Sequence, residues 1–156
     1  MVELTLIGVR VELPANQPIV LLKEKSGERF LPIWIGAFEA TAIAFALQGI
    51  ETARPMTHDL MKNIMDQMGI NMQQVLISDL KEGTFYADIT MTYDGKPFQI
   101  DARPSDAIAL AVRTGVSIFS DEHVLNEASV FIETEEEDEI ERFRDFLKDA
   151  KPEDFM

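Results

Sequence analysis

The sequence predicts an α+β fold: a mainly antiparallel sheet with about three to four packed helices. One observation is a pair of alternating, strand-like runs on either side of Asp94-Gly95, a dipeptide typical of tight β-hairpins. A second is a set of three segments that carry apolar residues at helical spacing and end near a glycine. The chain has 156 residues, of which 46% are hydrophobic and 27% charged, and this composition is typical of one globular domain.

The N-terminal third has the pattern of three antiparallel strands. Residues 2–13 alternate imperfectly between apolar and polar side chains, and residues 14–18 have the composition of a turn. Residues 19–23 form a second apolar run, which Ser26-Gly27 connects to residues 29–35. We therefore expect a three-stranded meander.

Two helices are expected next. Residues 37–47 are apolar on nearly all sides, which predicts a helix buried on most of its surface. Thr57 is a good N-cap for the second helix. This helix carries an apolar stripe, which we interpret as core because methionine commonly fills gaps there. The stripe consists of Leu60, Met61, Ile64, Met65 and Met68.

Residues 75–81, 84–93 and 96–103 predict a second antiparallel group. If Asp94-Gly95 is a two-residue loop, Tyr93 faces Lys96, and every later pair follows from that register. One face is then apolar and is expected to belong to the core, with Phe85, Ala87, Ile89, Met91, Phe98, Ile100 and Ala102. The opposite face is polar and places Asp88 directly opposite Asp101.

The remaining segments complete the fold. Ser105 is the expected N-cap of a third helix that ends at Gly115. Shorter elements follow: a strand at 116–119, an irregular or short helical piece at 121–127, a sheet edge at 130–132 and a helix at 138–150. This pattern predicts an α+β domain over residues 1–132 and an acidic helical tail over residues 133–156.

Composition and charge restrict the function. The chain has no cysteine and only two histidines, which excludes a structural zinc site. It has neither a long apolar run nor a signal-peptide pattern, so we expect a cytoplasmic protein without membrane contact. A net charge of −14 opposes nucleic-acid binding, which depends on Lys and Arg contacts to phosphates. Any DNA or RNA partner would therefore need a local basic patch, a divalent metal, or both.

The predicted register makes Asp88 and Asp101 a candidate metal pair. Carboxylates this close repel each other unless a cation lies between them, and Mg²⁺ or Mn²⁺ would suit their oxygens. Arg103 is an alternative cation, because it follows Asp101 by two residues on the same predicted face. The competing interpretation is a solvated sheet face on which Arg103 bridges two aspartates.

Two Arg-Pro segments at predicted helix starts are further candidates. In the first, Arg103 and Ser105 could bind a phosphate at a helix N-terminus, although Asp106 already offsets the positive helix end. In the second, which begins at Arg54, His58 could act as a general base. The competing interpretations are a capped helix with an ion pair and a lone surface histidine. His123 has no partner evident in the sequence.

Four segments resemble the bifunctional nuclease domain family. They are Leu31-Pro32-Ile33-Trp34-Ile35-Gly36, Arg54-Pro55-Met56-Thr57-His58-Asp59-Leu60, Gly83-Thr84-Phe85-Tyr86-Ala87 and Asp101-Ala102-Arg103-Pro104-Ser105-Asp106-Ala107-Ile108-Ala109-Leu110-Ala111. They occur in order, and the resemblance spans about residues 2–132. It implies a compact α+β domain that self-associates as a homodimer or larger homo-oligomer, and a nuclease activity on DNA and RNA.

We therefore carry two functional hypotheses. The first is a phosphodiesterase assisted by Mg²⁺ or Mn²⁺. Its expected catalytic residues are Arg103, Asp101, Asp106 and His58, its substrate-binding residues Arg54, Ser105 and Asp59, and its metal ligands Asp101 and Asp88. The second is a non-enzymatic, homo-oligomeric binding or regulatory module in which the Arg and Asp residues form a structural network.

Overall fold

One sheet of eight strands organises the computed structural model, which describes residues 1–12 and 17–132. The strands lie in the order β6-β5-β4-β7-β1-β2-β3-β8. Their bounds are β1 Val2–Glu12, β2 Gln17–Glu24, β3 Arg29–Trp34, β4 Asn71–Lys81, β5 Thr84–Tyr93, β6 Lys96–Ala102, β7 Ser117–Ser120 and β8 Val130–Phe131. The helices are α1 Ala37–Leu47, α2 Thr57–Met68, α3 Pro104–Thr114 and α4 Glu122–Ala128. The predicted α+β class is confirmed.

Two antiparallel groups meet at β7. The strands β1, β2 and β3 form the predicted meander, and β4, β5 and β6 form the second group. Strand β7 joins them, because it pairs antiparallel with β1 and parallel with β4. Strand β8 pairs with β3 and closes that edge, as the sequence predicts.

The β5–β6 hairpin has the predicted register. Tyr93 pairs with Lys96, and Asp88 lies opposite Asp101. Both loop residues adopt positive φ, Asp94 at 52° and Gly95 at 74°, as a two-residue hairpin loop of the I′ type requires. This loop geometry explains why two residues determined the alignment of both strands.

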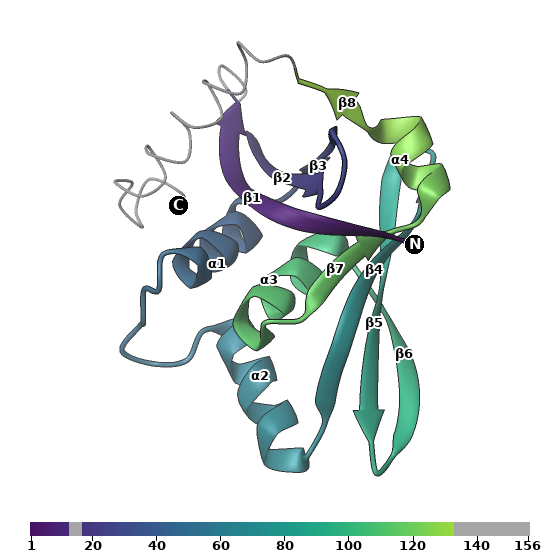
Figure 1. The fold of residues 1–156 in the computed structure, drawn as a ribbon. Helices are drawn as coiled ribbons and strands as arrows, with labels where there is room; N and C mark the ends of the chain where they lie inside the picture. The colour runs from purple at the N-terminus through teal and green to yellow at the C-terminus, as the bar shows by residue number, and fades with distance from the viewer. Residues whose placement is uncertain (13–16, 133–156) are drawn as a thin grey trace.

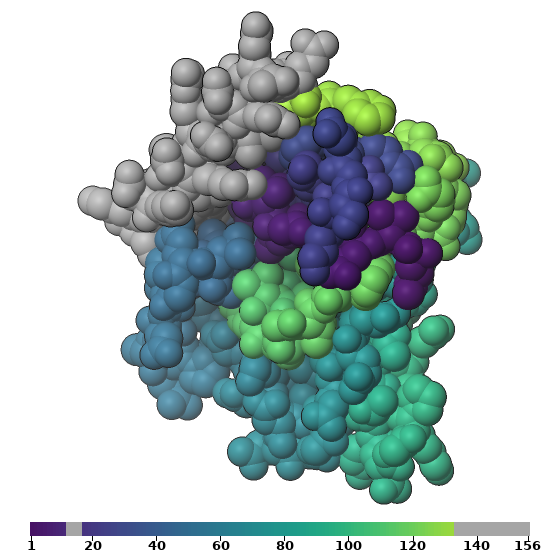
Figure 2. Space-filling view, in the orientation of Figure 1, coloured from purple at the N-terminus to yellow at the C-terminus, as the bar shows by residue number. Residues whose placement is uncertain are grey.

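The apolar face of this hairpin is only partly covered. Ala87 and Ile89 on β5 are buried, but Phe98 and Ile100 on the edge strand β6 are exposed. The expectation that both belong to the core is therefore wrong. The hairpin forms the lower right margin of the molecule in Figure 2, away from α1.

Three helices pack together along one side of the curved sheet. Helix α3 lies between α1 and α2 (Figure 1). Its buried run from residue 107 to residue 111 is rich in alanine, as is the buried run of α1, and small side chains let the two helices approach closely. Burial of α1 is confirmed for residues 40–45, whereas Phe38 near its start is exposed.

The apolar stripe of α2 is not core. Met65 is 7% exposed, but Leu60 is 52% exposed, and Met61, Ile64 and Met68 are exposed as well. Helix α2 lies at the end of the helical layer and packs mainly against α3 (Figure 1), so only one edge of its stripe is covered. A stripe indicates which face is apolar and does not indicate whether anything covers it.

The predicted N-caps are each displaced toward the N-terminus. Met56 caps α2 and Arg103 caps α3, where Thr57 and Ser105 had been expected. At α2 the Met56 N–H donates to Asp59 Oδ2 at 3.0 Å. At α3 the fixed φ of proline favours the first helical position, which makes the preceding residue the cap.

The predicted tail, residues 133–156, and its helix at 138–150 lie outside the described residues. Within the part of the chain that the structure describes, every helix is too short or too polar to cross a membrane.

Candidate functional site

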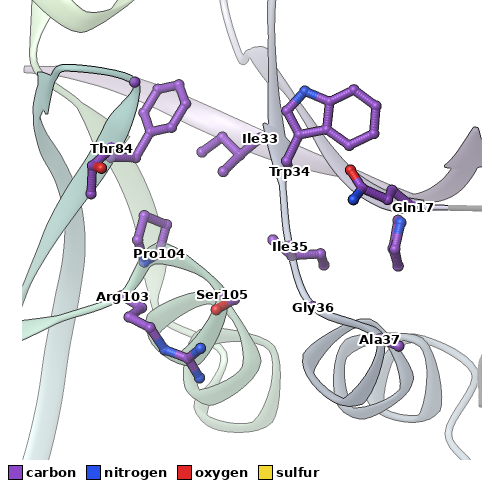
Figure 3. Close-up of a pocket in the computed structure, with 13 residues that line it drawn as sticks. Gln17, Ile33, Trp34, Ile35, Gly36, Ala37, Thr84, Arg103, Pro104 and Ser105 are labelled. Atoms are coloured by element: carbon purple, nitrogen blue, oxygen red, sulfur yellow. The ribbon is translucent and has the colours of Figure 1, made fainter. Parts of the chain in front are cut away.

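A pocket of about 610 Å³ lies between the beginnings of α1 and α3. Its volume is in the usual range for small-ligand sites. Three stretches that are distant in sequence form its walls: residues 33–37, residues 83–85 and residues 103–105, together with Gln17 and Pro18 (Figure 3). Each of these three stretches overlaps one of the segments that carry the family resemblance.

Two helix N-termini border this pocket. Gly36 and Ala37, the cap and first residue of α1, line it beside Pro104 and Ser105, the first two residues of α3. The first N–H groups of a helix have no partner within the helix, and the helix dipole makes that end positive. Glu39 and Asp106 in the first turns offset part of this positive charge, and Pro104 has no N–H. What this part of the pocket offers an anion is therefore the N–H groups at the start of α1 and the N–H of Ser105.

Ser105 supplies an unused hydroxyl to the pocket. The residue is only 6% exposed, yet its Oγ makes no hydrogen bond to the described residues. A serine in the second helical position has no helical carbonyl four residues earlier to accept its proton, so the hydroxyl is available to a ligand.

Arg103 is held at the pocket by two carboxylates. Its Nε donates to Asp106 Oδ2 at 2.9 Å and its Nη2 to Glu39 Oε1 at 2.6 Å. The hydrogen bond to Asp106, and after it the one to Glu39, raises the pKa of Arg103 above its usual value, so the guanidinium stays charged. The side chain is 64% exposed, and its Nη1 makes no hydrogen bond to the described residues. One donor edge of Arg103 therefore remains available.

His58 reaches this network through Asp106. The histidine is buried, and its Nε2 lies 2.9 Å from Asp106 Oδ1. Burial alone would raise the pKa of Asp106, but hydrogen bonds from Arg103 and His58 outweigh it and hold the pKa below its usual value. His58 does not line the pocket, so it positions Asp106, which in turn orients Arg103.

Asp59 belongs to a separate, structural ion pair. Its Oδ1 accepts from Arg113 Nε at 2.7 Å, and this bond is the main reason why the pKa of Asp59 is lowered. Arg113 also donates to the carbonyls of Ala42 and Ala109. The pair therefore connects α1, α2 and α3, and Asp59 does not line the pocket.

Besides Asp59, three further predicted site residues lie apart from the pocket. Asp88 and Asp101 face each other on the polar side of the β5–β6 hairpin, and Arg54 is exposed in the segment before α2. The expectation that Arg103 bridges the two aspartates is wrong, because Arg103 pairs with Glu39 and Asp106 instead. In residues 1–12 and 17–132, no three His, Asp or Glu side chains form a group that could hold a metal.

His123 has partners that the sequence did not reveal. Its Nδ1 lies 2.8 Å from Asp121 Oδ1 and its Nε2 lies 3.1 Å from Asp79 Oδ1. The hydrogen bond to Asp79 has the larger effect and the one to Asp121 the smaller, and both raise the pKa of His123. The cluster connects the start of α4 to β4 and lies outside the pocket.

Sequence reasoning missed several residues of the pocket. Trp34, Gln17 and Thr84 line it, and Glu39, in the first turn of α1, holds Arg103. The available signal was that Trp34 and Thr84 lie within segments of family resemblance. What could not be read from the sequence was that those segments meet in one place.

Comparisons with known proteins agree with the resemblance. The family described as the bifunctional nuclease domain matches residues 20–133. A Mycobacterium tuberculosis protein named "Uncharacterized protein Rv1829" is 45% identical, and the alignment covers 98% of this chain and 97% of that protein. "Bifunctional nuclease 2" of Oryza sativa subsp. japonica is 30% identical, covering 71% of this chain and 35% of the plant protein. "Bifunctional nuclease 1" of Arabidopsis thaliana is 28% identical, and the alignment covers 67% of this chain and 33% of the plant protein. The match thus spans about a third of each plant protein.

Proposed function

Because this chain belongs to the bifunctional nuclease domain family, we propose that it hydrolyses phosphodiester bonds of nucleic acid, DNA or RNA, in the pocket between α1 and α3. The observation that carries this proposal is the set of unused donors gathered there. It comprises the hydroxyl of Ser105, one edge of the Arg103 guanidinium, the first N–H groups of α1 and, because Pro104 has no N–H, the N–H of Ser105 at α3. A phosphate oxygen is the natural acceptor for such a set.

The donors have a role in the reaction beyond binding. Negative charge builds up on the phosphate oxygens in the transition state, and fixed donors stabilise it without reorganising. Ser105 is fixed by burial, and Arg103 is fixed by its two carboxylates. Glu39 is the candidate base for the attacking water: it does not itself line the pocket, but its carboxylate lies beside the lining residue Gly36.

Several of the predicted site residues act from outside the pocket or lie away from it. His58 and Asp106 are positioning residues that orient Arg103. Assistance by Mg²⁺ or Mn²⁺ through Asp101 and Asp88 stays a prediction. These two carboxylates lie on the polar face of the β5–β6 hairpin and do not line the pocket.

The negative charge of the chain fits a small site. With a net charge of −14, the protein repels a long polyanion, and among the described residues that line the pocket only Arg103 carries a cationic side chain. We therefore expect contact with one phosphate group rather than along a backbone.

A non-enzymatic module is the second candidate. It is favoured by the network of Arg103 with two carboxylates and of Arg113 with Asp59, which has the form of structural cross-links between helices. Such a module would bind an oligonucleotide at the pocket and release it uncut. The expected homo-oligomer stays a prediction. The molar mass measured by light scattering during size-exclusion chromatography would test it.

The deciding experiment is a cleavage assay on purified protein with labelled DNA and RNA oligonucleotides, with and without EDTA. We expect Arg103→Ala to lower the cleavage rate about 100-fold, because a transition-state donor is lost. Lys96→Ala, which removes an exposed cation at the tip of the β5–β6 hairpin, should leave the rate unchanged. Equal rates in wild type and Arg103→Ala would contradict the proposal, and binding without cleavage would favour the module.

A further inference from the structure

Trp34 is an exposed aromatic side chain at the pocket. It is the only tryptophan of the chain, it ends strand β3, and it is 55% exposed. A large aromatic ring left in solvent forgoes the gain of burial, and exposed aromatic rings in binding sites commonly stack on flat ligands. Its position in the pocket wall therefore indicates a planar ligand group.

Gln17 lies beside Trp34 and offers a free amide. The side chain is exposed and makes no hydrogen bond to the described residues. An amide can donate and accept at once, which is the combination that reads the edge of a nucleobase. Figure 3 shows Gln17 and Trp34 together on one side of the pocket, with Arg103 and Ser105 across from them.

The two sides of the pocket thus match the two ends of a nucleotide. The phosphate would lie at Ser105 and Arg103, the base at Trp34 and Gln17, and the sugar over Ile33 and Ile35 between them. We propose that the pocket binds an unpaired nucleotide of single-stranded nucleic acid, with its base stacked on Trp34. This inference rests on the proposed function, because it assigns the substrate class of the same pocket.

Two physical arguments exclude a duplex. A paired base is covered on both faces by its neighbours, so it cannot stack on a side chain until it is unstacked, which is unfavourable. Duplex binding also draws its affinity from many cationic contacts, and in the part of the pocket wall that the structure describes, Arg103 is the single cation, on a chain of net charge −14. Stacking does not depend on salt in this way, so it can support binding where the overall charge opposes it.

The test uses Trp34 as its own fluorescent reporter. A short oligothymidylate is titrated into the protein in EDTA and compared with an abasic oligomer of the same length and with a duplex. We expect the oligothymidylate to quench the Trp34 fluorescence and the other two to leave it unchanged. Anisotropy of a labelled oligothymidylate then measures affinity in variants: Trp34→Ala should weaken binding roughly 5- to 150-fold, and Trp34→Phe by much less.

The matched control is Tyr93→Ala, which removes an exposed aromatic ring at the far hairpin loop and should leave affinity unchanged. Equal binding of the oligothymidylate and the abasic oligomer would overturn the stacking inference while leaving the phosphate site intact. Equal or tighter binding of the duplex would overturn the single-strand preference. No binding of any oligomer, together with no cleavage, would overturn the proposed function as well.

Discussion

Asp59→Asn should destabilise the protein, because it leaves the charge of Arg113 without its counter-ion. Arg113 is only 8% exposed, and a buried charge that loses its partner typically costs about 3–5 kcal/mol. Asp59 is 36% exposed, so solvent screens part of this effect, and Arg113 keeps its bonds to the carbonyls of Ala42 and Ala109. We therefore expect a loss of about 2 kcal/mol in the free energy of unfolding at pH 7.

Thermal unfolding followed by circular dichroism measures this loss. For a domain of this size, about 2 kcal/mol corresponds to a decrease of roughly 4–8 °C in Tm. Asp66→Asn is the matched control, because it makes the same change in an exposed pair with Lys62 on the same helix. That pair should contribute less than about 0.5 kcal/mol.

The pH dependence of this difference gives a second check. Because the folded-state pKa of Asp59 is lowered, its ion pair stabilises the protein above the unfolded pKa, and this stabilisation is lost as pH falls through the folded pKa. The difference in Tm between wild type and Asp59→Asn should therefore shrink in acid. A difference that is absent at pH 7, or equally large in acid, would refute the reasoning.

Three further outcomes are expected. Asp79→Asn should lower the pKa of His123 in an NMR titration, because the mutation removes a hydrogen-bonded carboxylate. In the wild type the folded-state pKa of His123 is raised. The stabilisation from its contacts with Asp79 and Asp121 is therefore present below the unfolded-state pKa and is lost as pH rises through the folded-state pKa. Leu60→Ser should change the free energy of unfolding, measured in urea, by less than about 0.5 kcal/mol, because Leu60 is exposed. Met65→Ala, at a buried position of the same helix, should lower it by about 2 kcal/mol or more. Equal effects of the two mutations would contradict the exposed position of Leu60. Gly95→Ala should lower Tm by a few degrees, at about 1 kcal/mol, because φ at this position is 74°.

The fold could be predicted wherever local chemistry determines it. The loop at Asp94 and Gly95 has one favourable geometry, so the whole β5–β6 register followed from two residues. The sequence pattern predicts that this strand begins at residue 75, whereas β4 begins at Asn71, because its first residues are mostly polar and a bulge interrupts their alternation. The exposure of Leu60 depends on which elements pack over α2, and local pattern carries no such information.

The candidate site could be predicted only in part, for the same reason. Arg103, Ser105 and the anionic preference of a helix start could be read from one short segment. The contact of Arg103 with Glu39 spans 64 residues, and that of His58 with Asp106 spans 48. Pairings of this kind depend on how α1, α2 and α3 pack together. The same packing brings Trp34 to the pocket from a different part of the sheet.

The cleavage rate of Ser105→Ala tests the central claim most directly. The substitution removes one oxygen that makes no hydrogen bond to the described residues, so the fold and Tm should be retained. If this pocket holds the phosphodiester, the rate at saturating oligonucleotide should drop about 100-fold relative to wild type purified in parallel. A variant that folds normally and cleaves at the wild-type rate would contradict the assignment of the pocket.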